Sequence, residues 1–291
     1  MIDSQPYERI KQDYDETLQW LQSLGVTLGS GRSVTYHKAF DKVVLGYQSN
    51  ESVDVSYPEF MNAAFEIMQL IAIKDAFSLV ELSSIGFLKD RLQKAMSGPL
   101  YRVDEKQNTT APRNFLFELT TIARMYSPES GLKCIINARN DVGIKYGKHC
   151  LRAECKRITK LGQLSKRVAE ASKQLKSELT KMLGSGNVGL VVIDISKLIE
   201  DGGQIYAADT DDVLELETQK VLDHFIFEHS DVLQATLSSA HPKVLGVVVR
   251  CAFMGVSKER NLPVYISQWG IVPRDGIANG HQTLLKNLAN D

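Results

Sequence analysis

Residues 188–195 read Val-Gly-Leu-Val-Val-Ile-Asp-Ile, and this stretch points to the class of fold. It is apolar at almost every position and lacks the alternation of a strand with one wet face, so it predicts a β-strand covered on both faces. Before it, residues 163–182 carry apolar side chains at spacings of three and four, which predicts an amphipathic helix. A helix that leads into a doubly covered strand indicates an α/β domain with helices flanking a sheet.

The chain before and after this stretch extends the same pattern. Residues 141–144 and 149–158 predict two strands joined by a tight turn at 146–148. The remaining expected elements are helices at 113–126, 212–229 and 281–288, and strands at 132–137, 243–254 and 264–272. This order predicts a mixed β-sheet in a domain that spans residues 111–291.

Residues 1–100 have a different character, because their apolar residues follow helical spacing throughout. We expect helices at 7–24, 60–80 and 87–96, the second begun by Pro58, and hence an N-terminal helical domain. The polar, aperiodic residues 101–111 predict an interdomain linker. Such a domain suits a second copy of the chain or another protein as partner.

The charge is unevenly distributed along the chain. The total of 34 Lys and Arg against 35 Asp and Glu gives a net charge of −1, with 43% hydrophobic and 24% charged residues. This balance excludes intrinsic disorder and a wholly basic nucleic-acid binder. Residues 132–181, however, hold 13 basic and 4 acidic residues, whereas residues 200–231 hold 1 basic and 10 acidic ones. A charge separation of this size indicates an anionic partner for the basic segment, which the acidic segment could cover until that partner arrives.

Several classes of protein are excluded by simpler features. No apolar run approaches the roughly 20 residues that span a bilayer, and residues 1–22 are too polar for a signal peptide. The four cysteines lack the spacing of a zinc site or a disulfide framework. We therefore expect a cytoplasmic protein without a membrane partner.

The residues that carry chemistry lie on the strand at 149–158. Side chains alternate along a strand, so Glu154 and Lys156 share one face and Cys155 takes the other. Asp141 begins the neighbouring strand of the hairpin, which brings its carboxylate toward Glu154. Two carboxylates at one place repel unless a cation or a proton separates them, and Mg²⁺ prefers such oxygen ligands. A chance Glu-x-Lys on a solvated strand edge is the alternative.

The arrangement Asp141-x₁₂-Glu154-x-Lys156, with its flanking helices and strands over about residues 112–195, resembles the PD-(D/E)XK, or restriction-endonuclease-like, nuclease superfamily. Asn140 stands where that motif has proline. The resemblance implies a restriction-endonuclease-like core and hydrolysis of phosphodiester bonds, mostly in DNA. It implies that Asp141, Glu154 and the Cys155 carbonyl hold Mg²⁺ or Mn²⁺ and that Lys156 positions the attacking water.

The same resemblance assigns roles to two further residues. Glu118 stands where many members have an additional Glu on the preceding helix, and Gln163 where some have a polar residue at the start of the following helix. The alternatives are a solvated helix-edge residue for Glu118 and local hydrogen bonding at a helix N-terminus for Gln163.

Basic residues surround this motif and predict a nucleic-acid surface, because phosphate contacts supply most non-specific affinity. The residues expected to bind nucleic acid are Lys145, Lys148, Arg152, Arg157, Lys160, Lys166 and Arg167. Lys173 and Lys176 continue this surface, and a solvated helix face is the alternative.

The sequence thus favours a metal-dependent endonuclease acting on DNA, in restriction or antiviral defence. Two other hypotheses stay open. One is a non-catalytic nucleic-acid-binding or assembly module on the same fold. The other is a structural protein whose acidic segment, residues 200–231, binds the basic face of a second copy.

Overall fold

The computed structural model describes residues 2–29, 31–78, 85–126, 132–134, 142–146, 149–182, 184, 186–200 and 206–290. The chain forms two compact units: unit 1 comprises Met1–Thr120, Glu200–Glu217 and Ala252–Ser267, and unit 2 comprises Thr121–Ile199, Thr218–Cys251 and Gln268–Asp291. The predicted boundary near residues 101–111 stays a prediction, because these units divide the chain along a different line.

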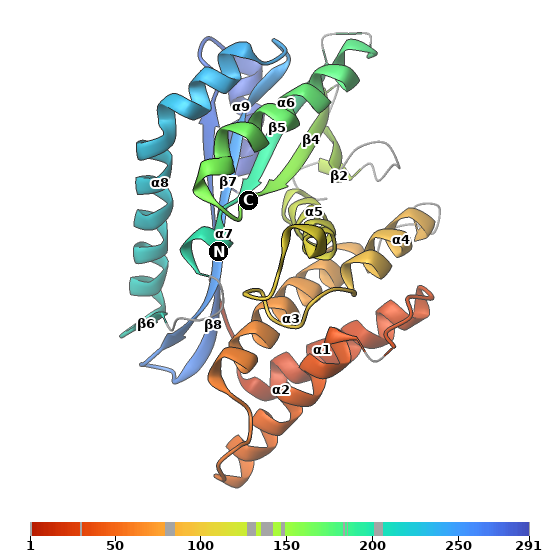
Figure 1. The fold of residues 1–291 in the computed structure, drawn as a ribbon, viewed down its shortest axis with the longest axis vertical. Helices are drawn as coiled ribbons and strands as arrows, with labels where there is room; N and C mark the ends of the chain where they lie inside the picture. Colours follow the sequence, from red (N-terminus) through yellow and green to blue (C-terminus); the bar gives the residue numbers. More distant parts are fainter. Residues whose placement is uncertain are drawn as a thin grey trace. The chain divides into compact units, whose positions relative to one another are not determined.

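Unit 1 is built mainly from helices, as expected for the N-terminal third. Its helices are α1 (Tyr7–Ser23), α2 (Arg32–Ser49), α3 (Tyr57–Phe77), α4 (Ile85–Ala95) and the first parts of α5 (Ala111–Met125) and α8 (Asp211–Ser239). Helices α1, α2 and α3 pack against one another (Figure 1). Almost every side chain of α3 between Phe60 and Ile71 is buried, which confirms that this long apolar segment is a central helix.

Local signals explain where these helices begin and end. The Ser56 hydroxyl accepts a hydrogen bond from the Glu59 backbone N–H at 3.3 Å, and Pro58 occupies the first turn of α3. Gly25 follows α1 with a φ of +77°, a left-handed conformation that glycine adopts without steric cost.

The polar segment around residues 101–110 is packed into unit 1. The Arg102 side chain is 3% exposed, and its guanidinium lies over the Phe65 ring, 4.1 Å from the centroid. It also forms a buried ion pair with Glu200 and a hydrogen bond to Asn62. Arg102 is therefore an anchor within unit 1, which polar composition alone does not reveal.

Unit 2 contains the predicted strand meander. Strands β2 (Leu132–Cys134), β3 (Val142–Tyr146) and β4 (His149–Arg157) pair antiparallel in that order. Strand β5 (Asn187–Asp194) pairs parallel to β4 on one side and to the first part of β7 (Val244–Ser257) on the other. The sheet is therefore mixed, as the sequence predicts. Residues 188–194 are all buried, which confirms the doubly covered strand.

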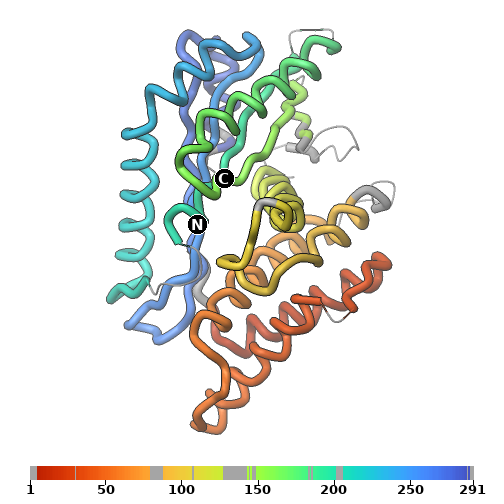
Figure 2. Tube along the Cα trace, in the orientation of Figure 1, coloured from red at the N-terminus to blue at the C-terminus, as the bar shows by residue number. Residues whose placement is uncertain are grey.

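Helix α6 (Leu164–Thr180) connects β4 to β5, after a short 3₁₀ turn at Leu161–Gln163 (Figure 2). It packs on both strands. A Cβ atom at Gly189 would lie 3.1 Å from Leu179 and 3.3 Å from Leu175, so the helix approaches β5 closely at this glycine. The elements α5, β2, β3, β4, α6 and β5 thus follow one another as predicted from the sequence.

The remaining elements are further strands of the sheet and further helices. They are β1 (Ile2–Ser4), α7 (Ser196–Ile199), β6 (Tyr206–Ala208), α8 (Asp211–Ser239), β8 (Leu262–Pro273) and α9 (Asn279–Asn290). Hydrogen-bonded neighbours follow the order β1-β8-β7-β5-β4-β3-β2, and β6 pairs with β7. The chain passes from one unit to the other within α5, α8, β7 and β8, and also between Ile199 and Glu200. In the described part of the chain, no helix has the length and apolarity required to cross a membrane.

Candidate active site

Strand β4 brings Glu154 and Lys156 together, as the alternation of side chains predicts. Glu154 Oε2 lies 3.6 Å from Lys156 Nζ. Both residues are central in the sheet, because β4 pairs with β3 on one side and with β5 on the other. At this distance the contact is an ion pair without a hydrogen bond.

The register assigns these two side chains to the face covered by α6. Glu154 pairs with Val191 and Lys156 with Ile193, and residues paired across parallel strands point to the same face. Gly189, two residues before Val191, faces α6. The helix therefore covers the face on which the Glu-x-Lys pair lies, and it explains why the Glu154 side chain is 7% exposed and that of Lys156 is 18% exposed.

Two predicted site residues, Asp141 and Lys148, lie outside the described residues. The strand that follows Asp141 in the sequence is β3, and its first residue Val142 pairs with Ala153, the residue before Glu154. The hairpin register therefore runs as the sequence predicts up to the neighbour of Glu154.

Glu118 has a partner in unit 1. It lies on α5, is buried, and forms an ion pair with the buried guanidinium of Arg91 on α4. It is therefore not the solvated helix-edge residue considered as an alternative. A buried carboxylate paired with a guanidinium has a structural role of its own, because loss of either partner would remove a countercharge from the other.

Cys155 and Gln163 occupy the positions expected of them. Cys155 is 6% exposed and alternates with Glu154 and Lys156, so its side chain lies on the opposite face of β4. Gln163 is half-buried and is the residue directly before α6, where its side chain makes no capping hydrogen bond.

The predicted nucleic-acid surface divides into exposed and buried members. Lys145, Lys160 and Lys166 are exposed, and Arg167 is half-buried with an ion pair to Glu170 at 3.0 Å.

Arg152 and Arg157 are the buried members of this predicted surface. Arg152 is 7% exposed, and the Arg157 side chain is also 7% exposed. Both lie on β4, a strand in the interior of the sheet. Their assignment to the nucleic-acid surface stays a prediction, and neither side chain is exposed in the way that Lys160 and Lys166 are.

Arg157 instead belongs to a buried charge cluster that the sequence patterns do not predict. Its Nε lies 3.7 Å from Oδ2 of Asp194, and Nη1 of Arg250 lies 3.7 Å from the same oxygen. Oδ1 of Asp194 accepts hydrogen bonds from the backbone N–H and the hydroxyl of Ser196. The available signal is a single charged residue inside an otherwise apolar strand, in VVID for Asp194 and VVVR for Arg250. By register this cluster lies on the face opposite Glu154.

The donors near Lys156 fit a hard divalent cation in type. The Glu154 carboxylate and the Cys155 carbonyl supply oxygen atoms, which Mg²⁺ and Mn²⁺ prefer. Within the described ranges, no group of three His, Cys, Asp or Glu side chains is arranged to hold a metal ion. Asp141 is outside those ranges, so the described oxygen donors are Glu154 and the Cys155 carbonyl.

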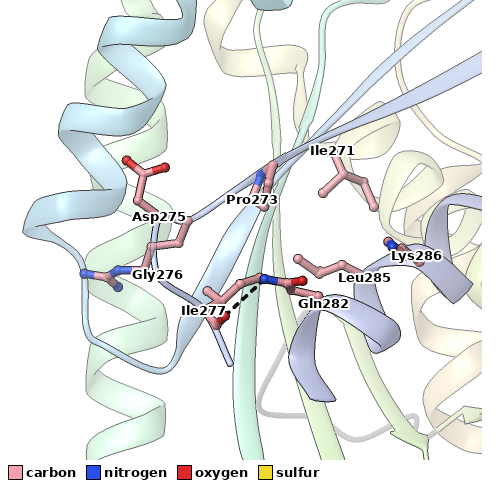
Figure 3. A pocket seen from close by; sticks show the side chains of 9 residues that line it. Ile271, Pro273, Asp275, Gly276, Ile277, Gln282, Leu285 and Lys286 are labelled. Atoms are coloured by element: carbon pink, nitrogen blue, oxygen red, sulfur yellow. Dashed lines mark hydrogen bonds between the residues drawn. The ribbon is translucent and has the colours of Figure 1, made fainter. Parts of the chain in front are cut away.

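A separate cavity of about 440 Å³ lies in unit 2 between the end of β8 and α9. Ile271, Pro273, Ile277 and Leu285 form its apolar lining. The Gln282 side chain lies across it, and its amide donates a hydrogen bond to the Ile277 carbonyl at 3.3 Å (Figure 3). Asp275 is the acidic residue in its lining, so this cavity lacks the paired carboxylates of a metal-dependent hydrolase.

Comparisons of the chain with protein-family models, with curated proteins and with solved structures found no match.

Proposed function

We propose that this chain is a metal-dependent nuclease that hydrolyses phosphodiester bonds in DNA. The observation that carries the proposal is the juxtaposition of Glu154 and Lys156 on a central strand, with 3.6 Å between carboxylate and ammonium. A carboxylate and an ammonium group held side by side within a sheet combine a cation ligand with a donor for a developing anion.

The position of the Glu154–Lys156 pair within the order of strands and helices also supports the proposal. It lies on the third strand of an antiparallel meander, and helix α6 leads from that strand to the doubly covered β5. This succession of elements is the one that the resemblance to the PD-(D/E)XK superfamily implies. Exposed lysines at positions 160 and 166 follow the pair in the chain and supply charge for phosphate contacts.

In this proposal each residue has a defined task. Glu154, the Cys155 carbonyl and Asp141 would hold Mg²⁺ or Mn²⁺, which supplies Lewis-acid stabilisation of the charge that develops on the phosphate. The Lys156 ammonium orients the attacking water or donates to a non-bridging phosphate oxygen. Hydrolysis adds water across one P–O bond and leaves a phosphate monoester and a free hydroxyl group.

The buried position of Glu154 favours its role as the metal ligand, with Lys156 as the group that acts on the water or the phosphate. A carboxylate with little access to bulk water interacts more strongly with a nearby cation, because the local dielectric is low. Lys156 retains more exposure than Glu154, so its ammonium can reach a substrate from the same face. Restriction or antiviral defence is the biological setting that we propose for this activity.

The test is cleavage of supercoiled plasmid, duplex oligonucleotide and RNA in Mg²⁺ and in Mn²⁺ by the full chain. We expect DNA cleavage that EDTA stops, and a loss of about 100-fold or more in Glu154→Gln and in Lys156→Gln. Glu178→Gln is the matched control, because Glu178 lies on α6 and pairs with the exposed Lys181 ammonium at 3.7 Å. Circular dichroism and thermal melting check that each variant is folded.

Two outcomes would overturn the proposal: wild-type protein that cuts no nucleic acid with either metal, or Glu154→Gln protein that cuts as fast as wild type. DNA binding without cleavage would instead support the non-catalytic nucleic-acid-binding module. Asp141→Asn should weaken Mg²⁺ binding in a calorimetric titration, and an unchanged affinity would remove Asp141 from the metal site.

A further inference from the structure

A cluster of basic groups gathers in unit 2 where α8 ends and β7 begins. His241 lies in the connection between these elements, and its Nδ1 accepts a hydrogen bond from the Lys243 backbone N–H at 3.2 Å. The Arg274 guanidinium, just after β8, donates to the His241 carbonyl at 2.8 Å. We call His241, Lys243, Arg274 and Lys176 of α6 the His241 cluster.

Two of these cations also satisfy carbonyl groups at the ends of helices. Lys243 Nζ donates to the carbonyls of Met182 and Gly184, which follow α6, at 3.4 and 2.9 Å. The carbonyls that accept from Arg274 are those of Ser238, Ala240, His241 and Val244 around the end of α8.

These helix ends do not cancel the charge of the cluster. A helix C-terminus carries about half a negative charge, so two of them offset about one of the three cations. The remaining positive field acts on the histidine. Burial lowers the pKa of His241, and Lys243, Lys176 and Arg274 lower it further in that order. Each charged group that acts on His241 among the described residues is thus a cation.

The cluster still has donors for an external anion. Because Nδ1 of His241 accepts a hydrogen bond, the proton of the neutral ring is on Nε2. The Lys243 ammonium has three protons and gives two of them to carbonyls. Lys176 is exposed, and no carboxylate in the described part of the chain pairs with it.

The exposed lysines of α6 lead toward this cluster. Lys166, Lys173 and Lys176 are exposed and fall within about 80° of one another around the helix, at about 100° per residue. Lys166 and Lys176 are separated by about 15 Å along the helix axis, which corresponds to about four steps of a DNA strand at 3.4 Å each. Lys160 precedes them in the turn after β4. A row of this length fits the backbone of a polyanion better than it fits a single small anion.

We infer that His241, Lys243 and Lys176 form a phosphate-binding site for duplex DNA, at the end of a row of α6 lysines that begins near the strand of Glu154 and Lys156. This inference rests on the proposed nuclease function for the identity of the polyanion. It adds a contact site beyond the predicted nucleic-acid surface, which did not include His241 or Lys243.

Binding of a phosphate at this site should be coupled to protonation. A phosphate beside His241 offsets the field of Lys243, Lys176 and Arg274, which removes part of the cause of the lowered pKa. The pKa of His241 is then higher in the complex than in the free protein. At a pH between the pKa of His241 in the free protein and its pKa in the complex, binding of DNA takes up protons. The affinity for DNA therefore rises as the pH falls through this range.

The experiment measures the dissociation constant of a fluorescein-labelled 20-base-pair duplex by anisotropy in EDTA, from pH 7.5 to pH 5.5 at constant ionic strength. We expect wild-type affinity to rise about three- to tenfold over this range, since one proton changes affinity by at most about tenfold per pH unit. His241→Gln should lose this rise. His224→Gln is the control, because His224 is an exposed histidine of α8 whose ring contacts Glu228 at 3.2 Å. It should retain the rise.

Lys176→Gln supplies a second readout in which no buried side chain is disturbed. The slope of log affinity against log salt should become shallower by about 0.9, the value for one duplex phosphate. The inference is overturned if His241→Gln keeps the wild-type pH dependence or if Lys176→Gln keeps the wild-type salt slope. Tighter binding of a single-stranded RNA of equal length would overturn the assignment to duplex DNA.

Failure of this inference can be told apart from failure of the nuclease proposal. Glu154→Gln should keep the His241-dependent binding while losing cleavage. Binding of this kind by a wild-type protein that cuts nothing would support the phosphate site and overturn the nuclease. If the wild-type protein cuts DNA but His241→Gln keeps the wild-type pH dependence of DNA affinity, the nuclease proposal is supported and the phosphate site is overturned.

Discussion

Asp194 and Arg250 are neighbours across two parallel strands, and Oδ2 of Asp194 lies 3.7 Å from Nη1 of Arg250. The same carboxylate faces the Arg157 guanidinium, also at 3.7 Å, so one buried negative charge is shared by two buried positive charges. Arg250 is fully buried and lies over the Trp269 ring, 5.6 Å from its centroid. The interior of unit 2 thus depends on Asp194 to balance its arginines.

Asp194→Asn should therefore destabilise the protein strongly. The asparagine keeps the shape but removes the negative charge that Arg157 and Arg250 share, and breaking a buried ion pair typically costs about 3–5 kcal/mol. Urea denaturation followed by circular dichroism measures the change. Asp223→Asn, at an exposed position on α8, is the control and should change the free energy of unfolding by less than about 0.5 kcal/mol. Equal midpoints for the two variants would show that Asp194 does not hold the cluster together.

The double substitution Lys166→Gln and Lys173→Gln should weaken DNA binding mainly at low salt. These exposed lysines act through phosphates of the duplex, so the salt slope should fall by about 0.9 for each phosphate that is no longer neutralised. Fluorescence anisotropy from 50 to 200 mM salt measures it. Lys38→Gln, an exposed lysine on α2 in unit 1, should leave the slope unchanged. If the double variant and this control have equal slopes, the α6 lysines form a solvated face.

The parts of the fold that the sequence predicts are those in which one pattern dominates. Residues 188–195 are apolar at almost every position and correspond to β5, and the regular spacing in residues 163–182 corresponds to α6. Helix α2 is not predicted, because its apolar residues do not form one stripe. Tyr36, Phe40 and Val44 are buried, whereas Leu45 and Tyr47 are 64% and 57% exposed.

The candidate site is predictable only in part, because alternation gives the face of a side chain but not what covers that face. Alternation places Glu154 beside Lys156 and Cys155 opposite them. It does not show that β4 is an interior strand under α6, nor that the Arg152 side chain on this strand is buried. Pairings between distant segments, such as Arg102 with Glu200, depend on tertiary contacts that no local pattern encodes.

The charges of the acidic segment, residues 200–231, likewise depend on contacts with distant segments. Its composition suggests carboxylates that are available for the basic segment or for a second copy. In unit 1, however, Glu200 is buried against Arg102, and Asp209 lies 3.0 Å from the Lys258 ammonium. Asp211 lies 3.5 Å from Arg260. Part of this negative charge is therefore already balanced locally, which a count of residues along the chain does not show.

Glu66→Gln should destabilise unit 1 by the same mechanism as the loss of Asp194. Glu66 lies 3.0 Å from Arg32 and 2.8 Å from Arg113, and it accepts a hydrogen bond from the Tyr36 hydroxyl at 3.2 Å. Neutralising it leaves two buried guanidinium groups without this carboxylate, at a cost of about 3–5 kcal/mol. Chemical denaturation with Asp54→Asn as the exposed control measures the loss. A Glu66→Gln protein as stable as this control would contradict the prediction.

Stability should also fall at alkaline pH because of Cys251. Burial raises the pKa of its thiol to about 12, with a further contribution from the Asp194 charge. In the unfolded chain the thiol has its ordinary pKa near 9, so the unfolded state loses this proton first and the free energy of unfolding decreases as the pH rises from 9 toward 12. At pH 10 the decrease due to this thiol is about 1 kcal/mol. Urea denaturation at pH 8, 9 and 10 should show it in wild type and in Cys150→Ser, whose thiol is only half-buried, and not in Cys251→Ser. An equal pH dependence in both variants would mean that other groups, such as the buried Tyr14 and Tyr36 with their raised pKa values, account for the alkaline instability.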